Sequence, residues 1–285
     1  MRAVAKPIDD PCSVFSVCVG SIQNVDLKTR LSQISPNYGN IASNYEDLAT
    51  VAQLSSLLVH TGDDESVVLG SVTKGELRNL YTQQMVGEKK PGRLIYEKLR
   101  ALSLGKLCPS CGFGQVKALD HYLPKSKYPL YSVLPANLIP TCRDCNTGKL
   151  ATSASVASSQ PIHPYFDKRH FFSDQWIFAS VEQTEPATLS FKVSPPDSWD
   201  QLSKARAASH FESYDLSDRF SVRVGEQLAV LRHQLARFPD PFLRGDHLRD
   251  MAADYEKVQK NSWQTAMHQA LAVSTWYCEV GYFKG

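Results

Sequence analysis

The chain has 285 residues, of which 42% are hydrophobic and 21% charged, an ordinary composition for a globular protein that can bury a sizeable core. No run of about 18 apolar residues occurs, which excludes a membrane-spanning helix. The formal net charge of +2 is too small to indicate any class of partner.

Two segments near the amino terminus differ in the structure that they predict. Residues 14–19 form a short apolar run typical of a strand, and residues 36–39, Pro-Asn-Tyr-Gly, are typical of a turn. From residue 43 or 44, apolar residues recur at a helical period and predict a helix that ends near His60.

Two further helices are predicted before residue 103. Thr73 and Glu76 have the spacing of a capping box, which begins a helix. Pro91 stands at the favoured first position of another helix. The sequence therefore predicts a mainly helical region over residues 1–103.

Two Cys-x-x-Cys pairs follow, and 30 residues separate them. Each pair can direct two thiolates to one metal ion, and two pairs close a tetrahedral zinc site that has no open position. Disulfide bonds are the alternative, but the chain shows no signal peptide, and a reducing cytoplasm favours zinc. The predicted ligands of this structural zinc are Cys108, Cys111, Cys142 and Cys145.

The stretch between the pairs predicts a small β–β–α arrangement. A strand is expected at residues 116–120, an irregular loop to about Pro135, and a short strand at residues 138–141. A helix should begin near Arg143 and run to about Ala151, before a serine-rich linker.

Three polar residues stand between the pairs, Asp120, His121 and Asn137, and a fourth, Asn146, directly follows the last cysteine. Asp and Asn offer hard oxygen ligands for Mg²⁺ or Mn²⁺, and a neighbouring His is a general base near neutral pH. A divalent cation beside such a base suits the hydrolysis of phosphodiesters. Because adjacent strand residues point to opposite faces, Asp120 and His121 can share one site only if the strand breaks there.

Positive charge gathers around these residues. Residues 88–150 hold eleven Lys or Arg against four acidic residues, a local charge of +7, which leaves −5 for the rest. A basic patch around a hydrolytic site suits a polyphosphate substrate, although a solvated charged surface is the alternative interpretation.

The last 130 residues predict a β-hairpin and then helices. Residues 176–181 and 188–193 are the two hairpin strands, and apolar stripes at helical spacing predict four helices between residues 199 and 274. His163 and His170 precede the hairpin, and we expect them to be packing or surface residues rather than part of the site.

The Cys pairs, the Asp-His dipeptide and the two asparagines resemble the ββα-metal module of HNH endonucleases, in the variant whose last His is Asn. The resemblance covers about 42 of the 285 residues. It implies that His121 is the general base, that Asp120 and Asn146 hold the divalent metal, and that Asn137 fixes the loop and so orients His121. Asn146 in place of His leaves the choice of metal open.

A narrower resemblance extends over Leu-Asp-His-Tyr-Leu-Pro-Lys-Ser and the residues up to Pro140. This stretch is similar to the HNH subunit, PtuB, of Septu anti-phage systems, including those attached to retrons. The resemblance implies a nucleic-acid substrate, DNA or RNA, and a partner subunit of the ABC-type ATPase class, PtuA-like. That partner would gate the nuclease.

The sequence thus predicts a cytoplasmic, mainly α protein with a small central ββα-metal (HNH) zinc-knuckle module and a short hairpin. The expected segments are 1–103, the module at 104–155, and a hairpin plus helical region at 156–285. The alternative function is a non-catalytic zinc-knuckle adaptor that binds nucleic acid or protein. The cysteines fit both functions, whereas Asp120, His121, Asn137 and Asn146 fit only the nuclease.

Overall fold

The computed structural model describes residues 1–148 and 154–284; the predicted end of the helix near Ala151 and the start of the serine-rich linker lie outside these ranges. The described residues are mainly helical, with small two-stranded antiparallel sheets. Contacts divide the chain into two compact units. Ala3–Asp167 is here named the site unit, and Lys168–Gly285 with Met1–Arg2 the carboxy-terminal unit.

The site unit combines the predicted helical region with the cysteine module, and it ends after Asp167 rather than near residue 155. A π-helical segment, Leu80–Met85, continues its fourth helix. The helices and strands of the unit are α1 (Pro11–Gly20), α2 (Val25–Ser32), α3 (Ser35–Thr50), β1 (Val67–Leu69), β2 (Val72–Thr73), α4 (Lys74–Asn79), α5 (Gly92–Arg100), β3 (Ala118–His121), β4 (Leu138–Thr141) and α6 (Arg143–Gly148).

The strand predicted at residues 14–19 is wrong, because these residues lie within α1. The carboxylate of Asp10 accepts a hydrogen bond from the amide of Ser13 at 2.8 Å, which caps the helix before the apolar run begins. The buried residues recur at i, i+1, i+4 and i+5, so they cover one face of a helix.

The turn predicted at residues 36–39 is also wrong, since these residues lie in α3. Pro36 stands in the first turn of that helix, where a missing amide hydrogen costs no hydrogen bond. The helix therefore begins earlier than expected and ends at Thr50 instead of near His60.

The capping box predicted for α4 is confirmed. The hydroxyl of Thr73 accepts from the amide of Glu76 at 3.3 Å, and the Glu76 carboxylate accepts from the amide of Thr73 at 2.9 Å. Glu76 also holds the guanidinium of Arg30 from α2, at 2.5 Å.

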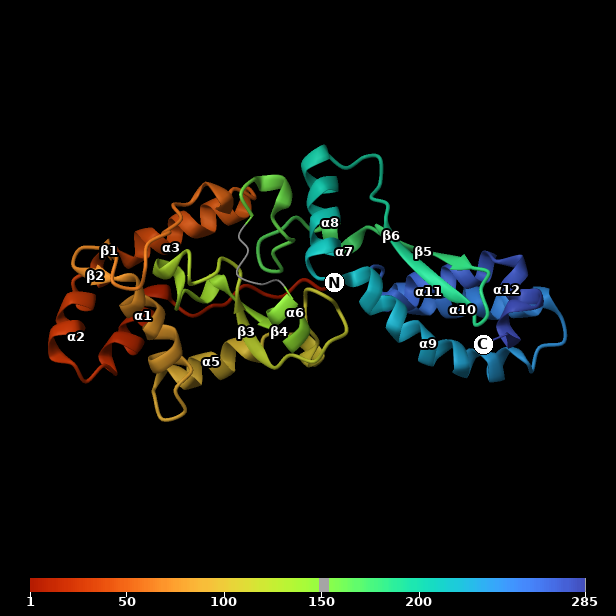
Figure 1. Cartoon of the computed structure of the whole chain (residues 1–285), viewed down its shortest axis with the longest axis horizontal. Coiled ribbons are helices and arrows are strands. Elements are labelled where there is room, and N and C mark those ends of the chain that lie inside the picture. Colours follow the sequence, from red (N-terminus) through yellow and green to blue (C-terminus); the bar gives the residue numbers. More distant parts are fainter. Residues whose placement is uncertain (149–153, 285) are drawn as a thin grey trace. The chain divides into compact units, whose positions relative to one another are not determined.

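The two strands and the helix of the cysteine module lie together, with α5 beside them (Figure 1). Strands β3 and β4 form an antiparallel pair from Ala118 opposite Thr141 to His121 opposite Leu138. Because side chains alternate along a strand, Leu138 enters the apolar cluster under α1, α4 and α5, and Ile139 enters a second cluster beside α3. The module is therefore built into the core of the site unit.

The carboxy-terminal unit confirms the predicted hairpin and long helices. Its antiparallel strands are β5 (Ile177–Glu182) and β6 (Thr188–Val193). Its helices are α7 (His170–Ser173), α8 (Gln201–Ser213), α9 (Leu216–Leu235), α10 (Pro241–Val258), α11 (Trp263–Val273) and α12 (Thr275–Glu279). Among the described residues, no helix combines the length and apolarity that crossing a bilayer requires.

Candidate functional site

Four buried cysteines converge at one point of the site unit. The sulfur atoms of Cys108, Cys111, Cys142 and Cys145 all lie within 4.8 Å of one another. A tetrahedral zinc with Zn–S bonds of about 2.3 Å needs sulfurs about 3.8 Å apart, and the Cys111 and Cys142 sulfurs are 3.9 Å apart. That separation exceeds a disulfide bond of about 2.05 Å, and none of the seven cysteines forms a disulfide. The donor set could hold a structural Zn²⁺.

The backbone around the first pair is shaped for these sulfurs. The amide of Cys108 donates to the Gly114 carbonyl at 2.7 Å, and the Gly114 amide donates to the Cys111 sulfur at 3.3 Å. A Cβ atom at Gly114 would lie 2.7 Å from the Cys142 sulfur. Only glycine lets the chain pass this close to the second pair.

Hydrogen bonds among the four thiols shift their pKa values in opposite directions. Bonds from Cys111, and then from Cys142 and Cys145, hold the pKa of the Cys108 thiol well below its ordinary value. The pKa of the Cys145 thiol is raised, first by its hydrogen bond to Cys108 and further by burial. A cation that binds all four sulfurs must therefore displace protons, and its affinity falls as the pH is lowered.

His121 ends β3 as a buried side chain with a fixed ring. Its Nε2 lies 2.8 Å from the carbonyl oxygen of Ser132, in the loop between the two strands. A carbonyl can only accept, so Nε2 carries the hydrogen and Nδ1 is the basic nitrogen of the neutral ring. The loop thus selects the tautomer that a general base needs.

Asp120 and Asn146 lie on elements that pack against each other, β3 and α6. Asp120 is partly exposed and the Asn146 side chain is exposed, so their oxygens belong to the surface of the module. Pairing continues through Asp120 opposite Ile139 and His121 opposite Leu138. The break expected at Asp120–His121 is therefore not found: both residues keep regular strand pairing, their side chains alternate between the two faces, and the strand ends only after His121.

Asn137 is fully buried and uses its whole hydrogen-bonding capacity. Its Oδ1 accepts from the Leu123 amide at 2.7 Å and from the Tyr45 hydroxyl at 3.0 Å. Its Nδ2 donates to the carbonyls of Leu123 and Tyr131, both at 3.1 Å. These bonds join both ends of the loop that presents Ser132 to His121, and they tie that loop to α3.

Several residues of this site carried no signal in the sequence. The ring of Tyr81 stands edge-on to the His121 ring, with centroids 4.3 Å apart, and in the sequence it belongs to an ordinary helical stripe. Ser132 contributes a backbone atom, which sequence patterns do not reveal. Gly114, three residues after Cys111 in a Cys-Gly-Phe-Gly run, was the one detectable signal.

The two histidines that precede the hairpin are packing residues. His163 is buried, and its Nε2 lies 3.3 Å from the hydroxyl of Tyr45. His170, in the carboxy-terminal unit, packs against Phe171 and Trp199.

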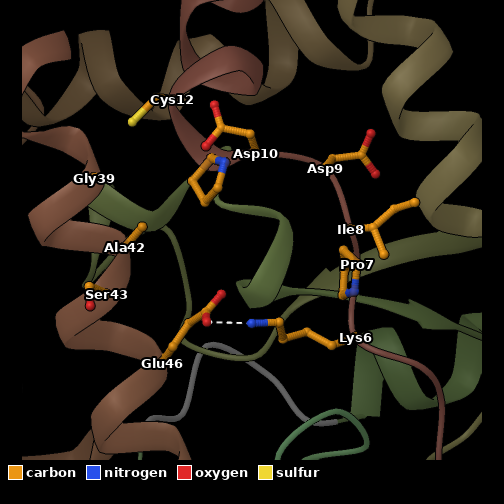
Figure 2. A pocket seen from close by; sticks show the side chains of 11 residues that line it. Lys6, Pro7, Ile8, Asp9, Asp10, Cys12, Gly39, Ala42, Ser43 and Glu46 are labelled. Carbon is orange, nitrogen blue, oxygen red and sulfur yellow. Dashed lines mark hydrogen bonds and ion pairs between the residues drawn. The ribbon is translucent and has the colours of Figure 1, made fainter.

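A separate cavity of about 570 Å³ lies between α3 and the segment that precedes α1 (Figure 2). Each charged side chain that lines this cavity forms an ion pair or caps a helix. Lys6 pairs with Glu46 at 2.5 Å, Asp9 with Lys98 at 2.7 Å, and Asp10 caps α1. The cavity includes none of the residues that the sequence singled out.

Comparison with known proteins gives one relative of nearly equal length. Protein ea31 of Escherichia phage lambda is 29% identical over 294 residues, which cover 96% of this chain and 98% of ea31. No known family profile matches the chain. No solved structure matches it significantly.

Replacing Gly114 by Ala should weaken metal binding, because the new Cβ would overlap the Cys142 sulfur. We expect purified Gly114→Ala protein to carry substoichiometric zinc by elemental analysis and to unfold at a lower temperature. Gly148→Ala is the matched control, since nothing lies within 4 Å of its added Cβ. Equal zinc contents in the two variants would contradict the close approach described here.

Replacing Asn137 by Asp should destabilise the site unit by about 3–5 kcal/mol, because two donors are lost and an acceptor then faces two buried carbonyls. Urea unfolding measures this loss. Asn44→Asp on the exposed side of α3 makes the same chemical change without these bonds and should stay within about 0.5 kcal/mol of the parent.

Proposed function

We propose that this chain is a metal-dependent endonuclease of the HNH type, which hydrolyses phosphodiester bonds in nucleic acid. The observation that carries the proposal is the fixed ring of His121, whose Nε2 is hydrogen-bonded to the Ser132 carbonyl at 2.8 Å. This ring ends the first strand of a β–β–α unit whose two ends converge on four sulfurs. A hydrogen bond that keeps the other ring nitrogen basic suits an imidazole that acts as a general base.

In the proposed reaction, Nδ1 of His121 takes a proton from a water molecule. The hydroxide oxygen bonds to phosphorus while the bond from phosphorus to the leaving ester oxygen breaks, and that oxygen keeps the electron pair. His121 becomes an imidazolium and keeps its hydrogen bond to Ser132, which holds the ring in place until the proton passes to solvent.

The oxygens of Asp120 and Asn146 would hold the catalytic cation, because hard oxygen donors prefer Mg²⁺ or Mn²⁺. Such a cation, when bound, offsets negative charge on the phosphate and on the leaving oxygen. The four thiolates, with no open position, would hold Zn²⁺ as a structural ion.

A basic cavity beside the module supports a polyphosphate substrate. It has a volume of about 350 Å³ and lies between the end of α5 and the ribbon that carries the first cysteine pair. Arg100, Lys106 and Lys117 line it, against the single acid Glu97. Glu97 already pairs with Arg93 and Arg100, both at 2.5 Å, so the two lysines supply the net positive charge.

The role in the cell is proposed from the Septu resemblance. An ABC-type ATPase subunit, in some systems with a retron, would dock on the chain and release its activity during anti-phage defence. The similarity to ea31 extends over both compact units, so the relative shares more than the 42-residue module. The test of gating is cleavage with and without a co-expressed ATPase partner; unrestrained cutting by the purified chain alone would count against it.

His121→Ala should slow the cleavage of plasmid DNA or bulk RNA in Mg²⁺ or Mn²⁺ by a factor of about 10²–10⁴, because the proposed general base is lost. Product formation on gels measures the rate and also identifies the polymer. His233→Ala, at an exposed position of α9, should leave the rate unchanged.

The same experiment separates the nuclease from the adaptor. An adaptor would bind its partner equally well with His121→Ala and would cleave neither polymer. Zinc-loaded, folded protein that cuts nothing, with or without an ATPase partner, would overturn the nuclease proposal in favour of the adaptor.

Replacing both Lys106 and Lys117 by Gln should weaken nucleic-acid binding and reduce its dependence on salt concentration. In the His121→Ala background, which keeps the polymer intact, the slope of log K against log salt should fall by about 1.8 for duplex DNA if each lysine neutralises one phosphate. Lys257→Gln with Lys260→Gln, which changes charge on and beside α10, is the control. An unchanged slope in the test variant would remove these lysines from the interface.

A further inference from the structure

Lys125 places a cation close to the proposed base. The residue is half-buried in the loop that follows β3, and its Nζ lies 4.8 Å from the centroid of the Tyr81 ring. At this distance the ammonium is attracted by the face of the aromatic ring. The loop thus holds a lysine that would otherwise extend into solvent.

Tyr81 contacts both Lys125 and His121. Its ring centroid is 4.3 Å from that of His121, at an interplanar angle of 72°. The two separations, 4.8 Å and 4.3 Å, put the ammonium no more than about 9 Å from the imidazole centroid. The Tyr81 hydroxyl donates to the Leu119 carbonyl at 3.1 Å, so the ring is fixed at both edges.

The backbone under this ring is unusual. Tyr81 belongs to the π-helical segment Leu80–Met85, in which the Val86 amide donates to the Tyr81 carbonyl at 2.9 Å. π-Helical turns inside helices occur frequently at functional sites, because they reorient side chains. Here the ring carried by this turn contacts both the Lys125 ammonium and the His121 ring.

Lys125 has no anionic partner among the described residues. Burial, and then the nearby Arg78 guanidinium, lower the pKa of its ammonium. Lys74 shows the contrast: it is also buried, but its Nζ donates to the carbonyls of His60 and Gly62 at 3.0 Å and 2.5 Å. A half-buried cation beside a second cation is costly until an anion binds.

A separation within this limit of about 9 Å can accommodate one phosphodiester. A nucleophilic water about 3 Å from the base, a phosphorus about 3–3.5 Å beyond it, and a charge-assisted hydrogen bond of about 2.8 Å form a bent chain of this reach. The phosphate between the two groups would contact both.

We propose that Lys125 is a further catalytic residue, whose ammonium donates hydrogen bonds to a nonbridging oxygen of the scissile phosphate. This inference rests on the proposed nuclease function. No bond to Lys125 forms or breaks; its charge offsets the negative charge that grows on phosphorus-bound oxygens as the hydroxide adds. Tyr81 is a positioning residue, which holds the ammonium toward that oxygen.

The test is single-turnover cleavage of duplex DNA and of RNA by full-length protein with the metal that supports activity. Lys125→Gln and Lys125→Met remove the charge, and Met keeps the aliphatic contact with Tyr81. Both should cleave about 100-fold more slowly than the parent, as expected for loss of one preorganised donor. Lys125→Arg keeps a cation and should recover at least tenfold of that loss.

Lys89→Gln, at an exposed position between the π-helical segment and α5, is the control for net charge and should stay within threefold of the parent. Zinc content and melting temperature verify folding; if either neutral variant fails to fold, the other, with Lys125→Arg, decides the outcome.

Two results overturn the inference. One is cleavage by the neutral variants within threefold of the parent, and the other is an equal loss in Lys89→Gln. If His121→Ala is inactive while the neutral Lys125 variants stay active, the role of Lys125 is refuted and the proposed nuclease function is not. An inactive parent, or an active His121→Ala, would instead refute the proposed function.

Discussion

The structure of the site depends on the convergence of four sulfurs that join the ribbon before β3 to the start of α6. Between these fixed ends the strands pair in one register, and a slip of one residue would turn every side chain to the opposite face. His121 would then leave the buried face on which Ser132 and Tyr81 meet it. The four sulfurs and the strand register thus decide where the His121 ring stands.

Hydrogen bonds made by buried polar groups hold the loop between β3 and β4 in place. Asn137 satisfies both lone pairs and both hydrogens inside the protein, and the loop that it holds carries the carbonyl that orients His121. Lys125 is the exception, since its ammonium has only an aromatic face as its described partner.

The sequence predicted the parts of this site that depend on spacing. The two cysteine pairs, the β4 bounds and the Thr73–Glu76 cap are local patterns with a direct geometric meaning. Contacts between distant segments, such as Tyr81 with His121, leave no local trace, and an apolar run such as residues 14–19 fits a strand or a helix until its cap is recognised. The resemblance supplied the roles of Asp120 and Asn146, which await experiment.

The hydrogen bond from the Tyr45 hydroxyl to Asn137 has a consequence for modularity. A cassette limited to residues 104–155 would lose two groups: the Tyr45 hydroxyl that binds Asn137 and the Tyr81 ring that contacts His121. The motif is therefore not self-contained, because α3 and the π-helical segment contribute side chains that contact Asn137 and His121. Recombination that moved the motif alone into another chain would transfer its ligands without the geometry that makes them a site.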